Sequence, residues 1–571
     1  MKSMLIAALL LLAPAAPAVR AAYLITADSL RAHEMVLAHD SLEGRRVGEE
    51  GEMKAARYIE SAFAAAGLQP RGTDGSWLQP FEFVRAIELG PGNRLVLNGA
   101  PLALHGEFEP MKQSASLAFD FDTIVDVGYG ITVEEADGNY DDYAGKDVAG
   151  KAVLIKRYAP SADENPHVDF EPYSSLTSKI NTALEHDAAG IFFITPEDQD
   201  DTLQPIGPVR ITPKDIPIIF LRRAGFEHLG LSLSDPAVLS AEGAVELVKV
   251  HDTGYNVLGY LPGETDTTVI IGAHYDHLGS GGPGSGSRYL GNDPQVHNGA
   301  DDNGSGTSVL LEIARHYAAQ AEKPHYSLLF AAFSGEEFGI LGSSHFARDM
   351  TVDSAKVRMM VNMDMDGRLA EQDNGLAVMG TGTTEAFTVY FDSLRREDVK
   401  ITQKKSGQGP SDHTAFYNRG IPVLMFFTGA HNDYHKPEDD WDRIDYAGLV
   451  TVADVVTDLV SYFDRYPGPL TFQKTKDPDE GKRASTFSVT LGIMPDYVAE
   501  VKGLRVDNVQ PDRPGERAGL LAGDIITRMG EIEIGDIYDY MNALGRFRKG
   551  DTTVVRVNRN AETVDLTVVF E

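Results

Sequence analysis

The spacing of hydrophobic and polar positions changes from one region of the chain to the next. Between residues 255 and 465, short apolar runs typical of buried strands alternate with amphipathic helical segments. The expected strands are Thr267–Gly272, Ser327–Phe333, Val357–Met363, Gly375–Met379 and Ile421–Phe427, and the expected helices are Thr307–Gln320, Gly342–Arg348 and Tyr446–Phe463. This alternation predicts an α/β domain whose sheet carries helices on both faces.

The regions on either side of this domain have different patterns of hydrophobic and polar residues. Residues 22–111, with a helical segment at Glu52–Ala66, are assigned to the N-terminal part of the α/β domain, which continues over 251–465. Residues 112–250 carry short strand-like runs around one helix, Ser175–His186, and predict a smaller β-rich domain inserted into the larger one. Residues 466–484 are rich in Pro, Lys, Asp and Gly and are predicted to be a linker, and 485–571 predict a third, β-rich domain.

The first 21 residues differ from the rest of the chain. Lys2 gives a positive start, Leu5–Leu12 form an apolar run, and Ala16-Pro17-Ala18 supplies small residues at a cleavage site. This pattern predicts a signal peptide over 1–21, and therefore export to the periplasm or the extracellular space. No later segment has the roughly 18–20 apolar positions of a membrane span.

Composition limits the chemistry and the partners. The chain has 85 acidic and 51 basic residues, a formal net charge of −34, which argues against nucleic acid as a partner. It has no cysteine, so any metal site must use histidines and carboxylates.

Histidines and carboxylates recur at the ends of the predicted strands. Five segments carry them: Gly272–His277, Asn298–Gly306, Ser334–Glu337, Asn362–Asp366 and Asp433–Asp439. In an α/β sheet these segments would meet at one edge, where several carboxylates repel each other unless a cation lies among them. Zinc accepts imidazole nitrogen and carboxylate oxygen, so the pattern favours a zinc site.

These five segments resemble the signature of the zinc-dependent M28 peptidases, a family of two-zinc exopeptidases that are mainly aminopeptidases. The resemblance spans about residues 253–465 and includes all five expected metal positions in order. It implies a zinc-exopeptidase (phosphorylase/hydrolase-like) fold, a mixed sheet sandwiched by helices. It also implies that His274 and Asp364 bind one zinc, that Glu337 and His435 bind the other, and that Asp302 bridges both.

The same resemblance assigns the reaction. A hydroxide between the two Zn²⁺ ions would attack the scissile carbonyl of a peptide with a free N terminus, with Glu336 as general base. Asp276 would orient His274 by contacting its side chain, without binding a metal itself. Tyr434 would bind the substrate and donate to the developing oxyanion, a role found in only some branches of the family.

The accessory regions have their own resemblances. Asp147–Ile155 and Ala188–Phe193 resemble parts of a protease-associated (PA) domain, which could cover the active-site cleft or act only as a scaffold. Arg517–Ile526 resembles part of a PDZ domain, and Leu491–Met494 fits its carboxylate-binding loop only loosely. A peptide ligand in that groove therefore stays one of two possibilities, the other being a structural domain.

Several alternatives remain open. The same fold is used by glutaminyl cyclase-like transferases with one zinc and by carboxypeptidases, and a non-catalytic peptide-binding protein is a third alternative. The complete ligand set beside Glu336 argues against the last. His277, His297 and His413 could line the site, although structural or surface roles are favoured for them, and Gly279–Gly286 is predicted to be a flexible loop near the cleft.

Overall fold

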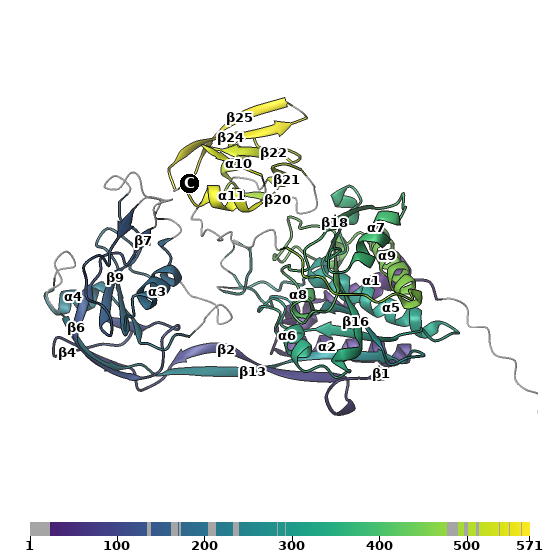
Figure 1. Ribbon diagram of the computed structural model, residues 1–571, viewed down its shortest axis with the longest axis horizontal. Coiled ribbons are helices and arrows are strands. Elements are labelled where there is room, and N and C mark those ends of the chain that lie inside the picture. Colours follow the sequence, from purple (N-terminus) through teal and green to yellow (C-terminus); the bar gives the residue numbers. More distant parts are fainter. Residues whose placement is uncertain are drawn as a thin grey trace, which may run out of the picture.

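The computed structural model describes residues 23–570 except 134–138, 162–169, 171–172, 204–212, 232–238, 283, 290, 292, 477–488, 496–500, 510–512, 536, 548 and 561. The predicted signal peptide, 1–21, lies outside the described residues. Figure 1 shows an α/β domain, an inserted domain joined to it by two long strands, and a C-terminal domain.

The α/β domain is built on one mixed sheet in the order β1-β13-β15-β14-β16-β19-β17-β18, with β2 also paired to β13. Its strands are β1 (Gln69–Pro70), β2 (Leu78–Leu89), β13 (Leu247–Leu261), β14 (Thr268–His274), β15 (Ser327–Phe333), β16 (Val357–Met363), β17 (Gly375–Met379), β18 (Lys400–Lys404) and β19 (Val423–Phe427). Strands β15, β14, β16 and β19 are parallel, so their carboxyl ends meet at one edge. Strand β13 runs antiparallel to β15, and β17 runs antiparallel to β19 but parallel to β18. The predicted α/β fold with a mixed sheet is confirmed.

Helices cover both faces of this sheet because alternate strand residues point to opposite sides. On β15, Phe330 packs in a core with Ile59 of α2, whereas Leu329 packs in a second core with Phe346 of α6 and Phe416 of α8. The helices are α1 (Ala27–Leu37), α2 (Glu50–Ala66), α5 (Gly306–Ala319), α6 (Leu341–Arg348), α7 (Glu385–Ser393), α8 (His413–Tyr417) and α9 (Tyr446–Arg465), with short helical turns η1 (Asp40–Arg45), η2 (Thr73–Gly75), η5 (Ala300–Ser305), η6 (Ser354–Lys356), η7 (Leu369–Gln372) and η8 (Trp441–Arg443).

The inserted domain contains an eight-stranded sheet in the order β4-β3-β12-β6-β9-β10-β11-β5. Its elements are β3 (Arg94–Leu97), β4 (Ala100–Leu102), β5 (Phe108–Pro110), β6 (Ala118–Asp126), β7 (Thr132–Val133), β8 (Tyr140–Asp141), β9 (Ala152–Lys156), α3 (Leu176–Glu185), β10 (Gly190–Ile194), β11 (Ile218–Leu221), α4 (Arg223–His228) and β12 (Leu239–Ala244). The predicted start at residue 112 is too late, because β3, β4 and β5 pair within this sheet. The strands that pair with β5 and β3, namely β11 and β12, are distant in sequence, so no local pattern marks the boundary.

Strands β2 and β13 connect the two domains as an antiparallel ribbon (Figure 1). The pairing runs from Leu89 opposite Leu247 to Leu78 opposite Val257, with one register shift after Val250. At its far end β13 also pairs with β15 in the α/β sheet. Strand β13 therefore belongs both to the ribbon that connects the domains and to the sheet of the α/β domain.

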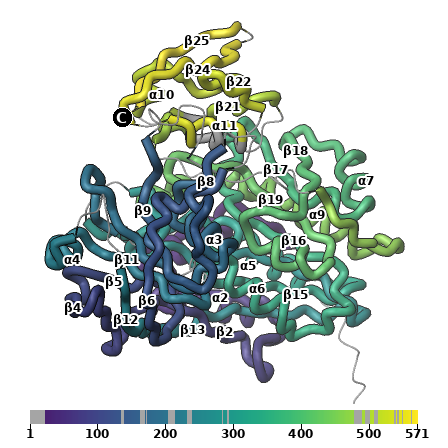
Figure 2. Tube along the Cα trace, turned by 60° about the vertical axis from the view of Figure 1, so that its left-hand side comes forward, coloured from purple at the N-terminus to yellow at the C-terminus, as the bar shows by residue number. Residues whose placement is uncertain are grey.

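The C-terminal domain has the sheet order β20-β21-β22-β24-β25, with β23 paired to β22. Its elements are β20 (Ile493–Pro495), β21 (Leu504–Val509), α10 (Pro514–Ala518), β22 (Ile525–Met529), β23 (Ile532–Glu533), α11 (Ile537–Leu544), β24 (Thr552–Arg559) and β25 (Glu562–Val569). Figure 2 shows this domain, in yellow, above the other two. Part of the predicted linker 466–484 packs on the α/β domain, where the ring of Phe472 lies 5.3 Å from that of Tyr417.

In the described part of the chain, one helix has the length and hydropathy of a membrane span, α9 at Tyr446–Arg465. Its buried side chains, among them Leu449, Val456 and Phe463, belong to the core of the α/β domain. A buried core helix meets the same criteria of length and composition.

Lys179 gives the inserted domain a testable pH dependence. Its buried amine donates to the carbonyls of Tyr129 (2.5 Å) and Lys156 (2.9 Å), and burial lowers the pKa of Lys179 to about 7 despite the nearby charge of Asp142. Above pH 7 the unfolded chain binds the proton that the folded domain releases, so stability should rise with pH by at most about 1.4 kcal/mol per pH unit.

Thermal unfolding of the native chain and of Lys179→Met between about pH 7 and pH 9 tests this expectation. The native chain should gain stability relative to the variant as the pH rises. Lys151→Met is the control, because Lys151 is partly exposed in the same domain. A difference between native chain and Lys179→Met that does not change with pH would contradict the prediction.

Candidate metal centre

The five predicted metal ligands meet at the carboxyl edge of the parallel strands. His274 is the last residue of β14, and Asp364 directly follows β16. Glu337 follows β15, and His435 lies in the loop after β19. Asp302 comes from η5, directly before helix α5.

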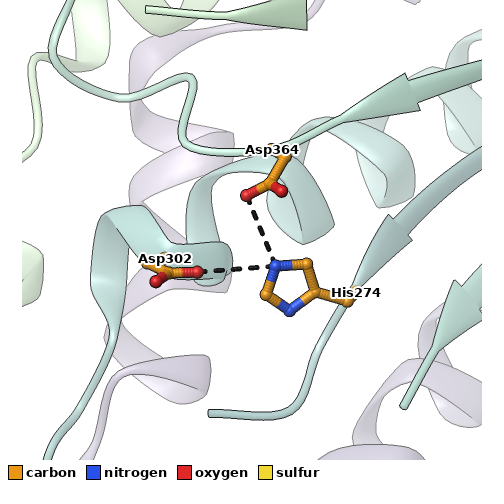
Figure 3. A group of neighbouring side chains, drawn as sticks. All are labelled: His274, Asp302 and Asp364. Atoms are coloured by element: carbon orange, nitrogen blue, oxygen red, sulfur yellow. Dashed lines mark hydrogen bonds and ion pairs between the residues drawn. The ribbon is translucent and has the colours of Figure 1, made fainter. Parts of the chain in front are cut away.

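His274, Asp302 and Asp364 form the first cluster (Figure 3). Nε2 of His274 lies 3.4 Å from Oδ1 of Asp302 and 3.3 Å from Oδ1 of Asp364. Figure 3 shows the two carboxylates approaching the same ring nitrogen from two different elements. All three side chains are buried.

The second cluster uses the other oxygen of Asp302. Nε2 of His435 lies 3.1 Å from Oδ2 of Asp302 and 3.2 Å from Oε2 of Glu337. Asp302 therefore faces one histidine with each of its two carboxylate oxygens. This is the arrangement expected of a ligand shared by two metal ions.

The distances and the donor atoms fit zinc. Ligand atoms about 2.0–2.1 Å from a tetrahedral zinc are about 3.3 Å from one another. The four contacts in these clusters measure 3.1 to 3.4 Å. Imidazole nitrogens with carboxylate oxygens are also a set that zinc accepts without thiolate.

Burial and neighbouring charges shift the pKa values of the two adjacent glutamates, Glu336 and Glu337, in opposite directions. Burial raises the pKa of Glu336 well above its usual value, and Asp364 adds to this against the opposing charge of His274. Burial also favours the neutral form of Glu337, but the charge of His435 outweighs it and holds the pKa of Glu337 well below its usual value. Glu336 is thus suited to hold a proton, whereas Glu337 is suited to stay ionised.

Asn303 ties the segment that carries Asp302 to the segment that carries Asp364. Its Oδ1 accepts hydrogen bonds from the amide at the start of α5 (2.9 Å) and from the amide of Met365 (3.2 Å). Its Nδ2 donates to the carbonyl of Met363 at 2.9 Å. One side chain thus fixes the spacing of two ligands from different elements.

Asp439 holds the Asp302 segment from the opposite side. Its carboxylate accepts hydrogen bonds from the amides of Asp301 (3.0 and 3.1 Å) and Asp302 (3.1 Å). It is fully buried and pairs with the guanidinium of Arg368 at 3.2 Å. Because Asp439 follows His435 by four residues, it joins the loops that carry these two ligands.

Arg45, from η1, joins the loops beneath the site. Its buried guanidinium donates to the carbonyls of Tyr275 (2.7 Å), Asn298 (2.5 Å) and Gly299 (2.9 Å). The sequence gives no local signal for this role, because the acceptors are backbone atoms far along the chain.

Asp276 contacts His274 less directly than the resemblance implies. Its Oδ1 lies 3.7 Å from Nδ1 of His274, and its backbone carbonyl is nearer, at 3.3 Å. The same Oδ1 accepts a hydrogen bond from the amide of Glu336 at 3.0 Å. Asp276 therefore connects the segment of His274 to that of Glu336.

Tyr434 lies against the second cluster. Its ring stacks on the ring of His435 with centroids 3.8 Å apart, and the guanidinium of Arg288 lies 5.9 Å from its centroid. Burial and the charges of Asp302 and Glu337 raise the pKa of Tyr434 well above its usual value. The hydroxyl therefore keeps its proton and can act as a donor.

The three further histidines that could line the site, His277, His297 and His413, differ in their positions. Nδ1 of His277 lies 2.8 Å from Oε1 of Glu337, and the side chain is fully buried, so His277 does not lie on the surface. His297 contacts the hydroxyl of Ser287 at 2.7 Å, outside both clusters. Burial lowers the pKa of His413 to about 4, with Asp364 opposing the change.

The glycine-rich segment contacts His435, one of the predicted metal ligands. Nδ1 of His435 lies 3.0 Å from the carbonyl of Gly286, and the amide of Arg288 donates to the carbonyl of His435 at 2.9 Å. These two contacts hold the end of the 279–286 loop, which was predicted to be flexible, against His435. Contact through Nδ1 leaves Nε2 of His435 free to face the cluster.

Comparison with known families identifies two of the domains. Residues 256–460 match the model of peptidase family M28. This chain therefore contains a family M28 peptidase domain. Residues 472–569 match the PDZ domain model, which confirms the second resemblance.

Curated relatives resemble the M28 domain. A probable leucine aminopeptidase of Trichophyton verrucosum is 30% identical over 213 residues, 35% of this chain and 54% of that protein. Another from Arthroderma otae is 32% identical over 179 residues, 30% of this chain and 45% of that protein. Aminopeptidase YwaD of Bacillus subtilis is 28% identical over 261 residues, 42% and 51% of the two chains. The chain spans about half the length of these relatives.

Two solved structures are more distant. An aminopeptidase from Aneurinibacillus sp. strain AM-1 is 23% identical with a TM-score of 0.45, over 79% of this chain and 96% of that one. A zinc aminopeptidase from Bacillus subtilis is 21% identical with a TM-score of 0.44, over 79% and 99%. These scores add nothing to the family assignment.

The contacts of Asp439 predict a role in metal binding. Asp439→Asn would turn one acceptor oxygen into a donor that opposes the amides of Asp301 and Asp302. We expect zinc affinity to fall about 10–100-fold, measured by competition with a chelator. Asp433→Asn is the control, because Asp433 also pairs with Arg368, at 3.3 Å, and is not among the acceptors of those amides. Equal zinc affinity in both variants would contradict the role.

Proposed function

We propose that this chain is an exported, two-zinc aminopeptidase that removes N-terminal residues from peptides. The observation that carries the proposal is the placement of Asp302, with one oxygen 3.4 Å from His274 and the other 3.1 Å from His435. The names of the curated relatives support aminopeptidase activity.

The ligand set supports two ions. His274 and Asp364 would hold one zinc, Glu337 and His435 the other, and Asp302 both. The three carboxylates supply three negative charges that offset most of the charge of two Zn²⁺ ions. Bound zinc lowers the pKa of its water to about 7 and polarises a carbonyl. A shared carboxylate of this kind favours two ions over the single zinc of a glutaminyl cyclase-like transferase.

Glu336 is the proposed general base. Its Oε2 lies 4.0 Å from Nε2 of His274, and its amide is held by Asp276 at 3.0 Å. Burial raises its pKa well above the usual value, which favours proton uptake. Glu336 would take the proton of the attacking water and deliver it to the leaving amine. Tyr434, which keeps its proton, would donate to the developing oxyanion.

The remaining parts of the proposal concern location and partners. The positive start, the apolar run and Ala16-Pro17-Ala18 support export to the periplasm or the extracellular space. The inserted domain is proposed to be a protease-associated domain. The PDZ domain is proposed to bind an extended peptide by strand addition.

Hydrolysis of a peptide panel by the metal-loaded full chain tests this function. The panel should include free, N-acetylated and C-amidated forms of the same peptides, each with and without a chelator. Cleavage should require the free amine and be lost on chelation. Glu336→Gln should lower kcat about 10²–10⁴-fold with zinc content unchanged.

Glu385→Gln is the matched control, because Glu385 is exposed in the first turn of α7. It should leave kcat and KM unchanged. Cleavage of acetylated peptides that requires a free carboxylate would show a carboxypeptidase instead. No cleavage of any form, with zinc bound, would overturn the peptidase proposal.

A further inference from the structure

His277 is a buried histidine at the metal centre to which neither the resemblance nor the proposed reaction gives a role. It lies three residues after His274 and is fully buried. Its Nδ1 is 2.8 Å from Oε1 of Glu337 and 3.9 Å from Oδ2 of Asp302. A histidine this close to a proposed zinc ligand is either a further ligand or a partner of that ligand.

The distances distinguish the two roles. Two ligands of one tetrahedral zinc lie about 3.3 Å apart, and His435 meets this value with both carboxylates of the second cluster. The 2.8 Å contact of His277 is shorter and has the length of a hydrogen bond. His277, Asp302 and Glu337 are also close enough together to hold a metal ion, but the 3.9 Å between His277 and Asp302 is longer than the about 3.3 Å between two ligands of one tetrahedral zinc. His277 therefore has the position of a partner of Glu337.

The two oxygens of Glu337 face different histidines. Oε2 is directed to His435, at 3.2 Å, and Oε1 is directed to His277. Among the described residues, neither Nδ1 of His277 nor Oε1 of Glu337 has a hydrogen-bond partner elsewhere. Each is thus the available partner of the other.

The surroundings restrict the ring of His277. A Cβ at Gly299 would lie 2.5 Å from its ring, so the backbone of Gly299 closes one side. The ring of His435 lies edge-on to it, with centroids 5.8 Å apart and planes at 74°. The ring therefore has little room to turn Nδ1 away from Glu337.

We propose that His277 is a positioning residue that donates from Nδ1 to Oε1 of Glu337 and so leaves Oε2 to bind the metal beside His435. Partners of this kind orient metal ligands and raise metal affinity. The inference rests on the proposed two-zinc site. It assigns no contact between His277 and the substrate.

Three substitutions test the proposal through zinc affinity. His277→Asn keeps a donor near the position of Nδ1, His277→Gln moves the donor towards the position of Nε2, and His277→Ala removes it. In the full chain, one of the two zinc equivalents should bind about 10–100-fold more weakly in His277→Ala and His277→Gln, and His277→Asn should restore most of the affinity. The other equivalent should be unchanged in all three variants.

Two further measurements separate positioning from coordination and from packing. X-ray absorption at the zinc edge should give an average of one imidazole per zinc in the native chain and in His277→Asn, whereas coordination by His277 would give a higher count that falls in the variant. Thermal unfolding of the metal-free proteins should rank the variants differently from zinc affinity. If His277 acted only in packing, thermal stability and zinc affinity would rank the variants in the same order, and His277→Asn would not restore zinc affinity.

The outcomes distinguish this inference from the proposed function. A native chain that binds fewer than two zinc ions would overturn the two-zinc site and the inference with it. A native chain that binds two, with His277→Ala binding both at native affinity, would overturn only the role of His277.

Discussion

Repulsion among buried carboxylates is the constraint on which the site depends. The parallel strands and their following loops bring many acids to one edge, namely Asp276, Asp301, Asp302, Glu336, Glu337, Asp364, Asp366, Asp412 and Asp439. Among the described residues, the buried guanidinium groups of Arg45 and Arg368 lie beneath this edge and offset part of the charge. The remainder requires protons or bound cations, because isolated buried charges are costly. A site of this composition therefore favours either protonated carboxylates or a bound metal cation.

The same constraint explains why the supporting contacts span the sequence. Asn303 links the Asp302 and Asp364 segments, and Asp439 links the loops of Asp302 and His435. Arg45 adds a connection from the N-terminal region. Ligands that repel each other keep their spacing only if their backbones are tied together. Metal binding at the proposed site would consequently be coupled to the folding of the whole α/β domain, since no single segment carries the site.

The sequence predicted the parts of the molecule that local patterns encode. The strands Ser327–Phe333, Val357–Met363 and Gly375–Met379 match the structure at both ends, because continuous apolar runs mark buried strands. Glu337 and Asp364 follow two of these runs, and they meet His274, Asp302 and His435 where the parallel strands end. The start of the inserted domain was wrong because β3 finds its partner, β12, much later in the chain. His277, Arg45 and Asp439 depend on contacts between distant segments, which spacing alone does not reveal.

The ribbon of β2 and β13 has a consequence for the architecture of the α/β domain. The chain leaves the ribbon at Leu89 and returns at Leu247, and these residues are paired directly opposite each other. In topological terms, the whole inserted domain occupies the place of a single hairpin turn. The α/β sheet keeps the same connectivity whether that turn is two residues or a complete domain. The insertion is therefore a module that the peptidase fold can gain, lose or exchange without rearranging its own strands.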